Sequence, residues 1–347
     1  MNRKKIYIAY TGGTIGMKKS RSGYIPVAGY LKKKIMKIPD FQKKEIPFFK
    51  INEYQPLIDS SNMTPNEWNI IANDIHKNYK KYDGFIILHG TDTMAYTASA
   101  LSFMLQNLEK PIIITGSQIP LSEIRSDGKQ NLLNALIIAA NYPINEVTLF
   151  FNHKLFRGNR STKSNANGFN AFTSPNFPCL LKTGISIYHD YKIIKNKYKK
   201  NIKYYSITPQ PIGIITIYPG ISEKIIHNFI VQPLKALILC SYGVGNAPQN
   251  KKFLNELNYA SKKNIILVNL TQCTSGTVNM SGYATGNALS NVGVISGYDL
   301  TVEAALTKLH FLFSSYKSVD KIKKIMKKNL CGELTPEKNN TLHNSKY

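Results

Sequence analysis

Two short apolar runs in the sequence end in a glycine followed directly by a threonine. They are IAYTGGTI (8–15), which presents Thr14, and FIILHGTDT (85–93), which presents Thr91 and Asp92. A hydroxyl is a weak nucleophile at neutral pH and reacts only when a base or a relay takes its proton. The repeated pattern therefore allows three interpretations, which are a phosphate cradle, a tight turn, and the seat of a reactive hydroxyl.

The sequence argues against the phosphate interpretation. A P-loop requires G-x-x-x-x-G-K-[ST], and a dinucleotide site requires G-x-G-x-x-G at the start of a helix. The segment TGGTIGMKKS (11–20) satisfies neither, and residues 16–29 show no helical period. These residues predict a mobile loop that carries Tyr24 next to Thr14, which is typical of an active-site lid. A plain tight turn, with Thr14 as a helix cap, remains open for the isolated motif.

The elements that must position these residues alternate along the first half of the chain. We predict strands over 5–10, 85–90, 111–117 and 147–152, and helices over 66–79, 95–105 and 128–141. Strands that are apolar on both faces and alternate with helices indicate a parallel α/β sheet. Ligands bind such sheets at the carboxyl ends of the strands. The hydroxyl-bearing strand ends, including TGS (115–117), are therefore expected to converge on one small site.

A length of 347 residues indicates two domains. We predict a larger N-terminal α/β domain over 1–190, with a flavodoxin- or Rossmann-like parallel sheet that carries the site. Residues 191–212 are expected to form a linker or a strand-bearing crossover. A smaller C-terminal α/β domain follows over 213–347, with strands in 213–220, 236–243 and 264–271, a helix over 302–316 and a polar tail from about 335.

Composition restricts the partners. The formal charge is +25, but only 5 of the 45 basic residues are arginine, the residue best suited to reading bases and gripping phosphates. The charge is therefore interpreted as solvated lysine, and no nucleic-acid partner is expected. No apolar run reaches the ~18–20 residues of a membrane span, and no export signal is recognisable, so a cytoplasmic protein without membrane contact is expected. The scattered cysteines indicate neither disulfides nor a metal site.

Five segments together resemble the L-asparaginase family, and most closely its cytoplasmic type I branch. They are TGGTI (11–15), GFIILHGTDTMAYTASAL (84–101), PIIITGSQIP (111–120), RSDGKQNLLNA (125–135) and SYGVGNAP (241–248). The resemblance extends from residue 6 to about residue 315. It implies a cofactor-free amidohydrolase that converts L-asparagine and water into L-aspartate and ammonia, and that assembles as a homodimer or homotetramer.

The resemblance also implies roles for individual residues. Thr14 would attack the side-chain amide carbon and form a β-aspartyl ester, while Tyr24 on the lid would orient the Thr14 hydroxyl. Thr91 would handle the hydrolytic water or share in activating the nucleophile. Lys163, beside Asp92, would act as base through Thr91. Which threonine attacks first stays open.

Substrate contacts follow from the same resemblance. Ser60 and nearby backbone N–H groups would hold the α-carboxylate, and Asp59 and Asp92 would face the α-ammonium. The matching positions also include Ser61 in the binding loop, Ser117 near the oxyanion pocket, and Asn246, which would approach the active site of a neighbouring subunit. Glycines in the two turns would let the backbone approach a small ligand closely.

A second, effector site is implied in the smaller domain, at Cys240, Thr271 and Cys273. The family pattern has an arginine just before SYGVGNAP, where this chain has Cys240, which cannot form a charged forked contact. Weak or absent cooperativity is therefore expected.

Two alternatives to a strict asparaginase remain, a broader asparaginase–glutaminase and a non-catalytic asparagine sensor. His89 is interpreted as a packing residue at the end of its strand.

Overall fold

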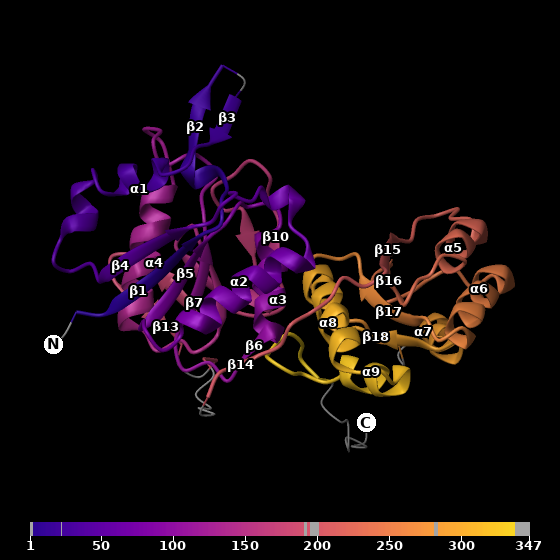
Figure 1. Ribbon diagram of the computed structural model, residues 1–347. Coiled ribbons are helices and arrows are strands. Elements are labelled where there is room, and N and C mark those ends of the chain that lie inside the picture. Colours follow the sequence, from indigo (N-terminus) through magenta and orange to yellow (C-terminus); the bar gives the residue numbers. More distant parts are fainter. Residues whose placement is uncertain (1–2, 22, 191–192, 195–200, 281–283, 337–347) are drawn as a thin grey trace, which may run out of the picture. The chain divides into compact units, whose positions relative to one another are not determined.

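The computed structural model describes residues 3–21, 23–190, 193–194, 201–280 and 284–336. The chain divides into two compact units, Met1–Pro209 and Gln210–Tyr347 (Figure 1). This division falls inside the expected linker at 191–212. Residues 191–192 and 195–200 of that linker lie outside the described residues, as do Ser22 of the expected lid and residues 337–347 of the expected polar tail.

The first unit is built on an eight-stranded sheet with the order β13-β12-β9-β8-β7-β5-β1-β4. Five neighbouring strands are parallel, and they are β1 (Lys5–Tyr10), β4 (Phe48–Glu53), β5 (Gly84–Leu88), β7 (Ile112–Thr115) and β8 (Val147–Phe151). The other three extend the sheet in antiparallel fashion, and they are β9 (Lys154–Arg157), β12 (Leu181–Thr183) and β13 (Ile187–His189). The predicted parallel α/β sheet is confirmed, with this antiparallel extension added to it.

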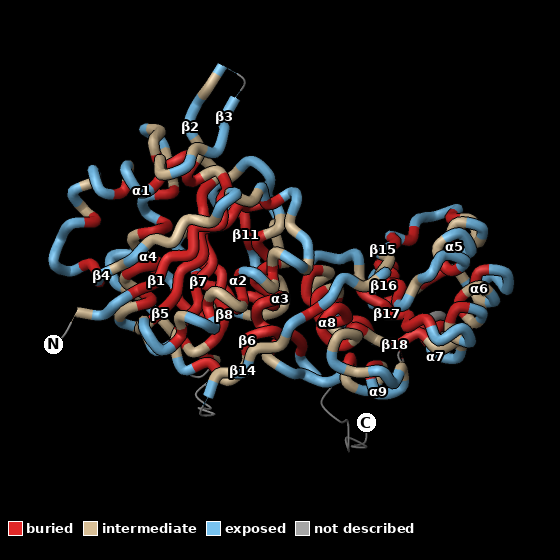
Figure 2. Tube along the Cα trace, in the orientation of Figure 1, coloured by how far each residue is buried: buried red, intermediate tan, exposed pale blue. Residues whose placement is uncertain are grey.

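Helices cover both faces of this sheet (Figure 1). On one face α1 (Tyr30–Ile35) and α4 (Gly128–Asn141) join the core formed by alternate residues of β1, such as Ile6 and Ile8. On the other face α2 (Pro65–Asn78) packs with α3 (Met94–Met104), and the β1 residue Tyr7 bonds to α2. The buried strands run through the middle of the unit in Figure 2. The three predicted helices are thus present within one residue of their expected bounds.

Short elements connect these layers. They are the 3₁₀ turns η1 (Thr14–Gly16), η2 (Pro39–Gln42), η3 (Ser60–Asn62) and η4 (Gly158–Arg160), and the strands β2 (Met17–Ser20), β3 (Gly23–Pro26), β6 (Leu105–Gln106), β10 (Thr162–Lys163), β11 (Phe172–Thr173) and β14 (Lys203–Tyr204). Strand β14 pairs with β6. The expected linker therefore carries a strand of the first unit.

The second unit has a four-stranded parallel sheet in the order β15-β16-β17-β18. Its strands are β15 (Ile212–Thr216), β16 (Ala236–Ser241), β17 (Ile266–Thr271) and β18 (Val294–Ser296). Its helices are α5 (Glu223–Ile230), α6 (Lys251–Lys262), α7 (Ala284–Asn291), α8 (Val302–Ser315) and α9 (Val319–Met326). The prediction of a second, smaller α/β domain is confirmed.

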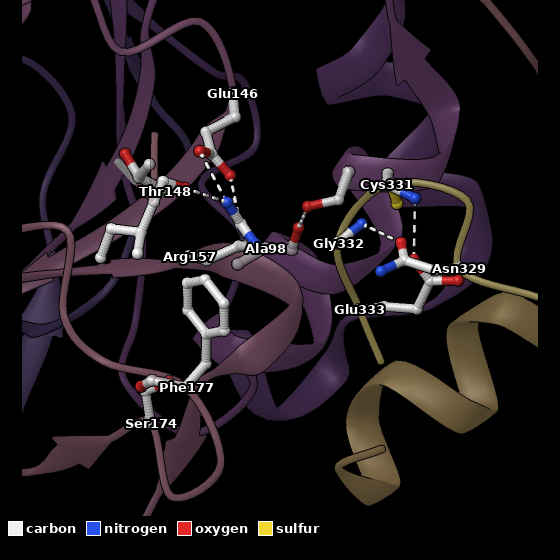
Figure 3. A network of polar contacts seen from close by, with 12 residues as sticks. Ala98, Glu146, Thr148, Arg157, Ser174, Phe177, Asn329, Cys331, Gly332 and Glu333 are labelled. Atoms are coloured by element: carbon white, nitrogen blue, oxygen red, sulfur yellow. Dashed lines mark hydrogen bonds and ion pairs between the residues drawn. The ribbon is translucent and has the colours of Figure 1, made fainter. Parts of the chain in front are cut away.

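Each unit contains a buried ion pair that fixes a chain segment. Figure 3 shows the pair of the first unit, Glu146 with Arg157. In the first, Arg157 Nε donates to Glu146 at 2.6 Å, and the guanidinium lies 4.3 Å from the centre of the Phe177 ring. In the second, Lys308 Nζ lies 2.6 Å from Glu333, and neither side chain has any exposed surface. Glu333 also accepts two backbone N–H groups from the segment that follows α9. Charges buried this deeply persist only when they are paired.

In the described part of the chain, every helix is too short or too polar to cross a membrane.

Candidate active site

The two glycine–threonine turns lie against each other at the carboxyl ends of neighbouring strands. Strand β1 pairs with β5, and the Thr11 N–H continues this pairing by donating to Leu88 O at 3.0 Å. Gly13 has φ 88°, and a Cβ placed on it would lie only 2.4 Å from Gly90 N. The backbones therefore touch at glycine, and the residues that follow the touching glycines are Thr14 and Thr91.

The expected substrate loop lies on the other side of the same turns. Ile58 N donates to Thr11 O at 2.7 Å, which places residues 59–61 alongside the first turn. Ser60 is buried, and its Oγ would be 2.3 Å from a Cβ on Gly90. Thr93 Oγ1 donates to Ser60 O at 2.6 Å. Because residue 90 is glycine, the Ser60 side chain can pack directly against the second turn.

Asp59 and Ser61 lie at the exposed end of this loop. Asp59 caps η3 by accepting the Ser61 N–H at 3.0 Å, and both side chains are exposed. The capping contact uses one carboxylate oxygen of Asp59. The other oxygen retains its capacity to accept hydrogen bonds from a ligand.

Lys163 reaches the second turn from β10. Its Nζ donates to Thr91 Oγ1 at 2.9 Å and to Asp92 Oδ1 at 2.8 Å. The lysine side chain is 21% exposed, whereas the Asp92 side chain is 64% exposed. An amine within hydrogen-bond reach of a hydroxyl is the geometry that a proton relay to threonine requires.

Ser117 lies in the turn after β7. It is buried, and its hydroxyl donates to Ile119 O at 2.6 Å. The neighbouring residue, Gln118, was missed by the sequence analysis although it belongs to the quoted segment ITGSQIP. Its Oε1 lies 3.1 Å from Thr91 Oγ1, so Gln118 rather than Ser117 bonds directly to the cluster.

Tyr24 lies on a β-hairpin formed by β2 and β3, which begins directly after η1. Tyr24 pairs with Lys19 across the hairpin, and its side chain is 44% exposed. The hairpin projects from the rest of the unit in Figure 1. The segment expected to be a mobile loop at 16–29 thus contains two short paired strands. Strands of four residues, none of them buried, are too short to leave a hydrophobic period in the sequence.

His89 is buried at the end of β5, as the sequence analysis expected. Its Nδ1 lies 2.7 Å from Gly90 O and its Nε2 lies 2.8 Å from Thr97 Oγ1. A carbonyl can only accept, so Nδ1 carries the hydrogen and Nε2 accepts from the Thr97 hydroxyl. Burial lowers the pKa of the imidazole to about 4, which keeps it neutral. His89 therefore holds the second turn in position from behind.

The remaining predicted site residues belong to the second unit. Thr271 ends β17, and its Oγ1 accepts the Cys273 N–H at 3.0 Å while donating to Gly243 O. Cys240 lies on β16 and is buried, and burial raises the pKa of its thiol. Asn246 forms an isolated β-bridge with Tyr242. Thr271 and Cys273 thus lie together, and Cys240 lies on the adjacent strand.

Among the described residues, no three His, Cys, Asp or Glu side chains gather in an arrangement that could hold a metal ion. Hydroxyls, one amine, one amide and carboxylates make up the first unit's cluster. Two α/β units, with this cluster at the strand ends of the larger one, define a two-domain α/β protein with a polar site of hydroxyl, amine and carboxylate groups.

Comparison with known families identifies the chain more closely. The model for "Asparaginase, N-terminal" matches residues 5–195, and the model for "Glutaminase/Asparaginase C-terminal domain" matches residues 211–326. The chain therefore belongs to the asparaginase family. The family resemblance drawn from the sequence motifs is confirmed.

Individual relatives cover nearly the whole chain. L-asparaginase 1 of Escherichia coli K12 is 62% identical over 337 residues, which are 97% of this chain and 100% of the relative. The crystal structure of L-asparaginase I from Vibrio cholerae has a TM-score of 0.90 at 59% identity, and the match covers 96% of this chain and 99% of the other. The thermostable L-asparaginase from Thermococcus kodakarensis has a TM-score of 0.86 at 29% identity, covering 96% and 100%.

Proposed function

We propose that this protein hydrolyses L-asparagine to L-aspartate and ammonia through a threonine-bound intermediate. The observation that carries the proposal is the 2.9 Å hydrogen bond from Lys163 Nζ to Thr91, in the turn that touches the one presenting Thr14. Membership of the asparaginase family, with 62% identity to an L-asparaginase 1, supports the same reaction.

Acylation is the first step of the proposed reaction. The Thr14 oxygen bonds to the side-chain carbonyl carbon of asparagine, and its proton passes through the polar cluster. The tetrahedral intermediate collapses with loss of the C–N bond, and the leaving nitrogen takes up a proton and departs as ammonia. Backbone N–H groups of the two touching turns would stabilise the developing oxyanion.

Deacylation restores the enzyme. A water molecule bonds to the acyl carbon of the β-aspartyl ester, and its proton passes to Thr91 while the Thr91 proton passes to neutral Lys163. The ester C–O bond then breaks, which releases aspartate and returns a proton to Thr14. The summed reaction consumes one asparagine and one water, and it yields one aspartate and one ammonia.

Recognition of the amino-acid end of the substrate falls to the loop around η3. The carboxylates of Asp59 and Asp92 suit the α-ammonium group, and Ser60 with nearby backbone N–H groups suits the α-carboxylate. Closure of the β2–β3 hairpin would bring Tyr24 over Thr14 and exclude water.

The same proposal includes a homodimer or homotetramer, in which Asn246 completes the active site of a neighbouring copy. A cytoplasmic location accompanies it.

The deciding experiment measures ammonia release from L-asparagine and L-glutamine by the wild type, Thr14→Ala and Thr91→Val. We expect the wild type to be active on asparagine and both variants to lose at least 10²-fold in kcat, because each removes a hydroxyl that acts in the reaction. A wild type that binds asparagine but releases no ammonia would indicate a sensor. Full activity of Thr14→Ala would reject Thr14 as the nucleophile.

The glutamine arm separates a strict asparaginase from a broader asparaginase–glutaminase. One extra methylene changes binding by only ~1–3 kcal/mol, so glutamine hydrolysis is expected to be slower by about 10- to 200-fold rather than absent.

A further inference from the structure

Gln118 connects the second threonine turn to the loop that follows Lys163. Its Oε1 lies 3.1 Å from Thr91 Oγ1. Its Nε2 donates to two backbone carbonyls of that loop, Ala166 O at 3.0 Å and Gly168 O at 3.1 Å. One carboxamide therefore uses both of its ends, and each end bonds to a different part of the site.

The orientation of this carboxamide is determined by its partners. If the amide were flipped, its oxygen would face two carbonyl oxygens, and none of these atoms can donate a hydrogen. Nε2 therefore faces the loop, and Oε1 faces Thr91. Because Oε1 only accepts and Lys163 Nζ donates to the same threonine oxygen, the Thr91 hydrogen must point at Gln118.

The backbone of Gln118 is held as firmly as its side chain. Its N–H lies 3.0 and 3.1 Å from the two carboxylate oxygens of Asp127, and that carboxylate also accepts the Ile119 N–H at 3.1 Å. Asn131 on α4 donates to Asp127 at 3.2 Å and to Gly116 O at 3.0 Å. The turn after β7 is thus fixed to α4 on both sides of Gln118.

The loop that Gln118 contacts has its own internal structure. Asn165 Oδ1 accepts the N–H groups of Asn167 and Gly168, both at 2.9 Å, and the Ser164 N–H donates to Ala171 O at 2.9 Å. These contacts close the β10–β11 hairpin immediately after Lys163. The Gln118 amide therefore links the hydroxyl of Thr91 to the hairpin that carries the proposed base.

We propose that Gln118 is a positioning residue that holds the Thr91 hydroxyl with its oxygen lone pairs toward Lys163 and toward the incoming water. The proposal rests on the function proposed above. In the resting site the Thr91 hydrogen bonds to Gln118, so the oxygen presents its lone pairs to Lys163 and to an incoming proton donor. When Lys163 is neutral, rotation about the Thr91 Cβ–Oγ1 bond turns the hydroxyl hydrogen toward Nζ. The proton then passes from Thr91 to Nζ, while Oγ1 takes a proton from the water. The amide oxygen is too weakly basic to take the proton itself.

The test uses Gln118→Met, which keeps the length of the side chain but removes the acceptor and both donors. We expect kcat to fall by about 10- to 100-fold, as positioning losses do, while KM for asparagine changes less than about threefold. Gln118→Glu adds a carboxylate beside Lys163. We expect it to move the ascending limb of the pH–rate profile to higher pH, because the added charge favours the protonated lysine. Gln130→Met and Gln130→Glu, at an exposed position on α4, are the matched controls and should change neither quantity.

A double-mutant cycle with Thr91→Val separates positioning from general stabilisation. Once the threonine hydroxyl is gone, Gln118→Met should lower kcat no further. An equal loss in both backgrounds, or a folded Gln118→Met with kcat within twofold of the wild type, would overturn the proposal. A change confined to KM would also overturn it, because Gln118 would then contact the substrate.

If Gln118→Met fails to fold, the nearly isosteric Gln118→Glu variant becomes the test. An unshifted pH–rate profile of that variant would reject the positioning role of Gln118. Failure of the proposed function has a different signature, because the wild type itself would then release no ammonia.

Discussion

Gly13 has no room for a side chain. A Cβ there would lie 2.4 Å from Gly90 N, and the residue also has φ 88°. Gly220 has a similar φ of 83° but nothing within 4 Å of its added Cβ, so it serves as a matched control.

We predict that Gly13→Ala lowers kcat at least 10²-fold, because the two turns must separate. Gly220→Ala should only destabilise the fold, by about 1–2 kcal/mol, through its backbone strain. Ammonia release and urea unfolding measure both effects. Equal behaviour of the two variants would show that backbone strain, rather than contact between the turns, explains the glycine.

His89 joins three elements of the first unit. Its ring lies at the end of β5 and accepts from Thr97 on α3, whose oxygen in turn accepts the Trp68 indole N–H from α2 at 3.1 Å. The folded pKa of His89 is about 4, against 6.5 for a free histidine. The unfolded chain therefore binds more protons between these pH values, and the free energy of unfolding falls as the pH is lowered through this window.

We predict that this group alone removes about 3 kcal/mol of stability between pH 7 and pH 4. His89→Gln should be less stable than the wild type at pH 7 but should lose less on acidification, as urea unfolding at both pH values would measure. His76→Gln, at an exposed position on α2, should retain the wild-type dependence. An unchanged pH dependence in His89→Gln would contradict the assignment of a buried neutral imidazole.

The elements that could be predicted are those buried on both faces. Every residue of β5 is buried, and β1 is buried except at its first residue, so their sequences read as continuous apolar runs. Strand β4 lies at the edge of the sheet and includes Lys50, Asn52 and Glu53, none of them buried. It was missed because an edge strand needs no apolar run. The β2–β3 hairpin was missed because its two strands are short and contain no buried residue.

The residues of the candidate site also differ in whether a buried strand next to them in sequence reveals their position. Thr14, Thr91 and Asp92 could be located from the sequence because they follow buried strands directly. Lys163 lies on a two-residue strand in a polar segment, so only the family resemblance pointed to it. Gln118 was overlooked because its importance comes from three contacts with residues distant in sequence. No local pattern records such contacts.

Three residues of the second unit match the positions of an effector site in the family pattern. Thr271 and Cys273, which match an effector site in the family pattern, lie in the second unit and are hydrogen-bonded to each other. Cys240 is buried and uncharged where the pattern has arginine. A neutral thiol cannot bind an effector carboxylate by a charged fork, so we expect little free energy to couple effector binding to activity.

We predict a nearly hyperbolic dependence of rate on asparagine concentration, with a Hill coefficient close to one. Cys240→Arg should raise this coefficient if the second unit retains the rest of the site, and the paired variant Cys240→Arg/Thr271→Ala should lower it again. Steady-state kinetics of ammonia release over a wide range of asparagine concentrations measures all three proteins. Cys240→Ala is the control for loss of the thiol alone and should resemble the wild type. A wild-type curve that is sigmoidal, survives Thr271→Ala and becomes hyperbolic on Cys240→Ala would mean that the thiol itself takes part in regulation.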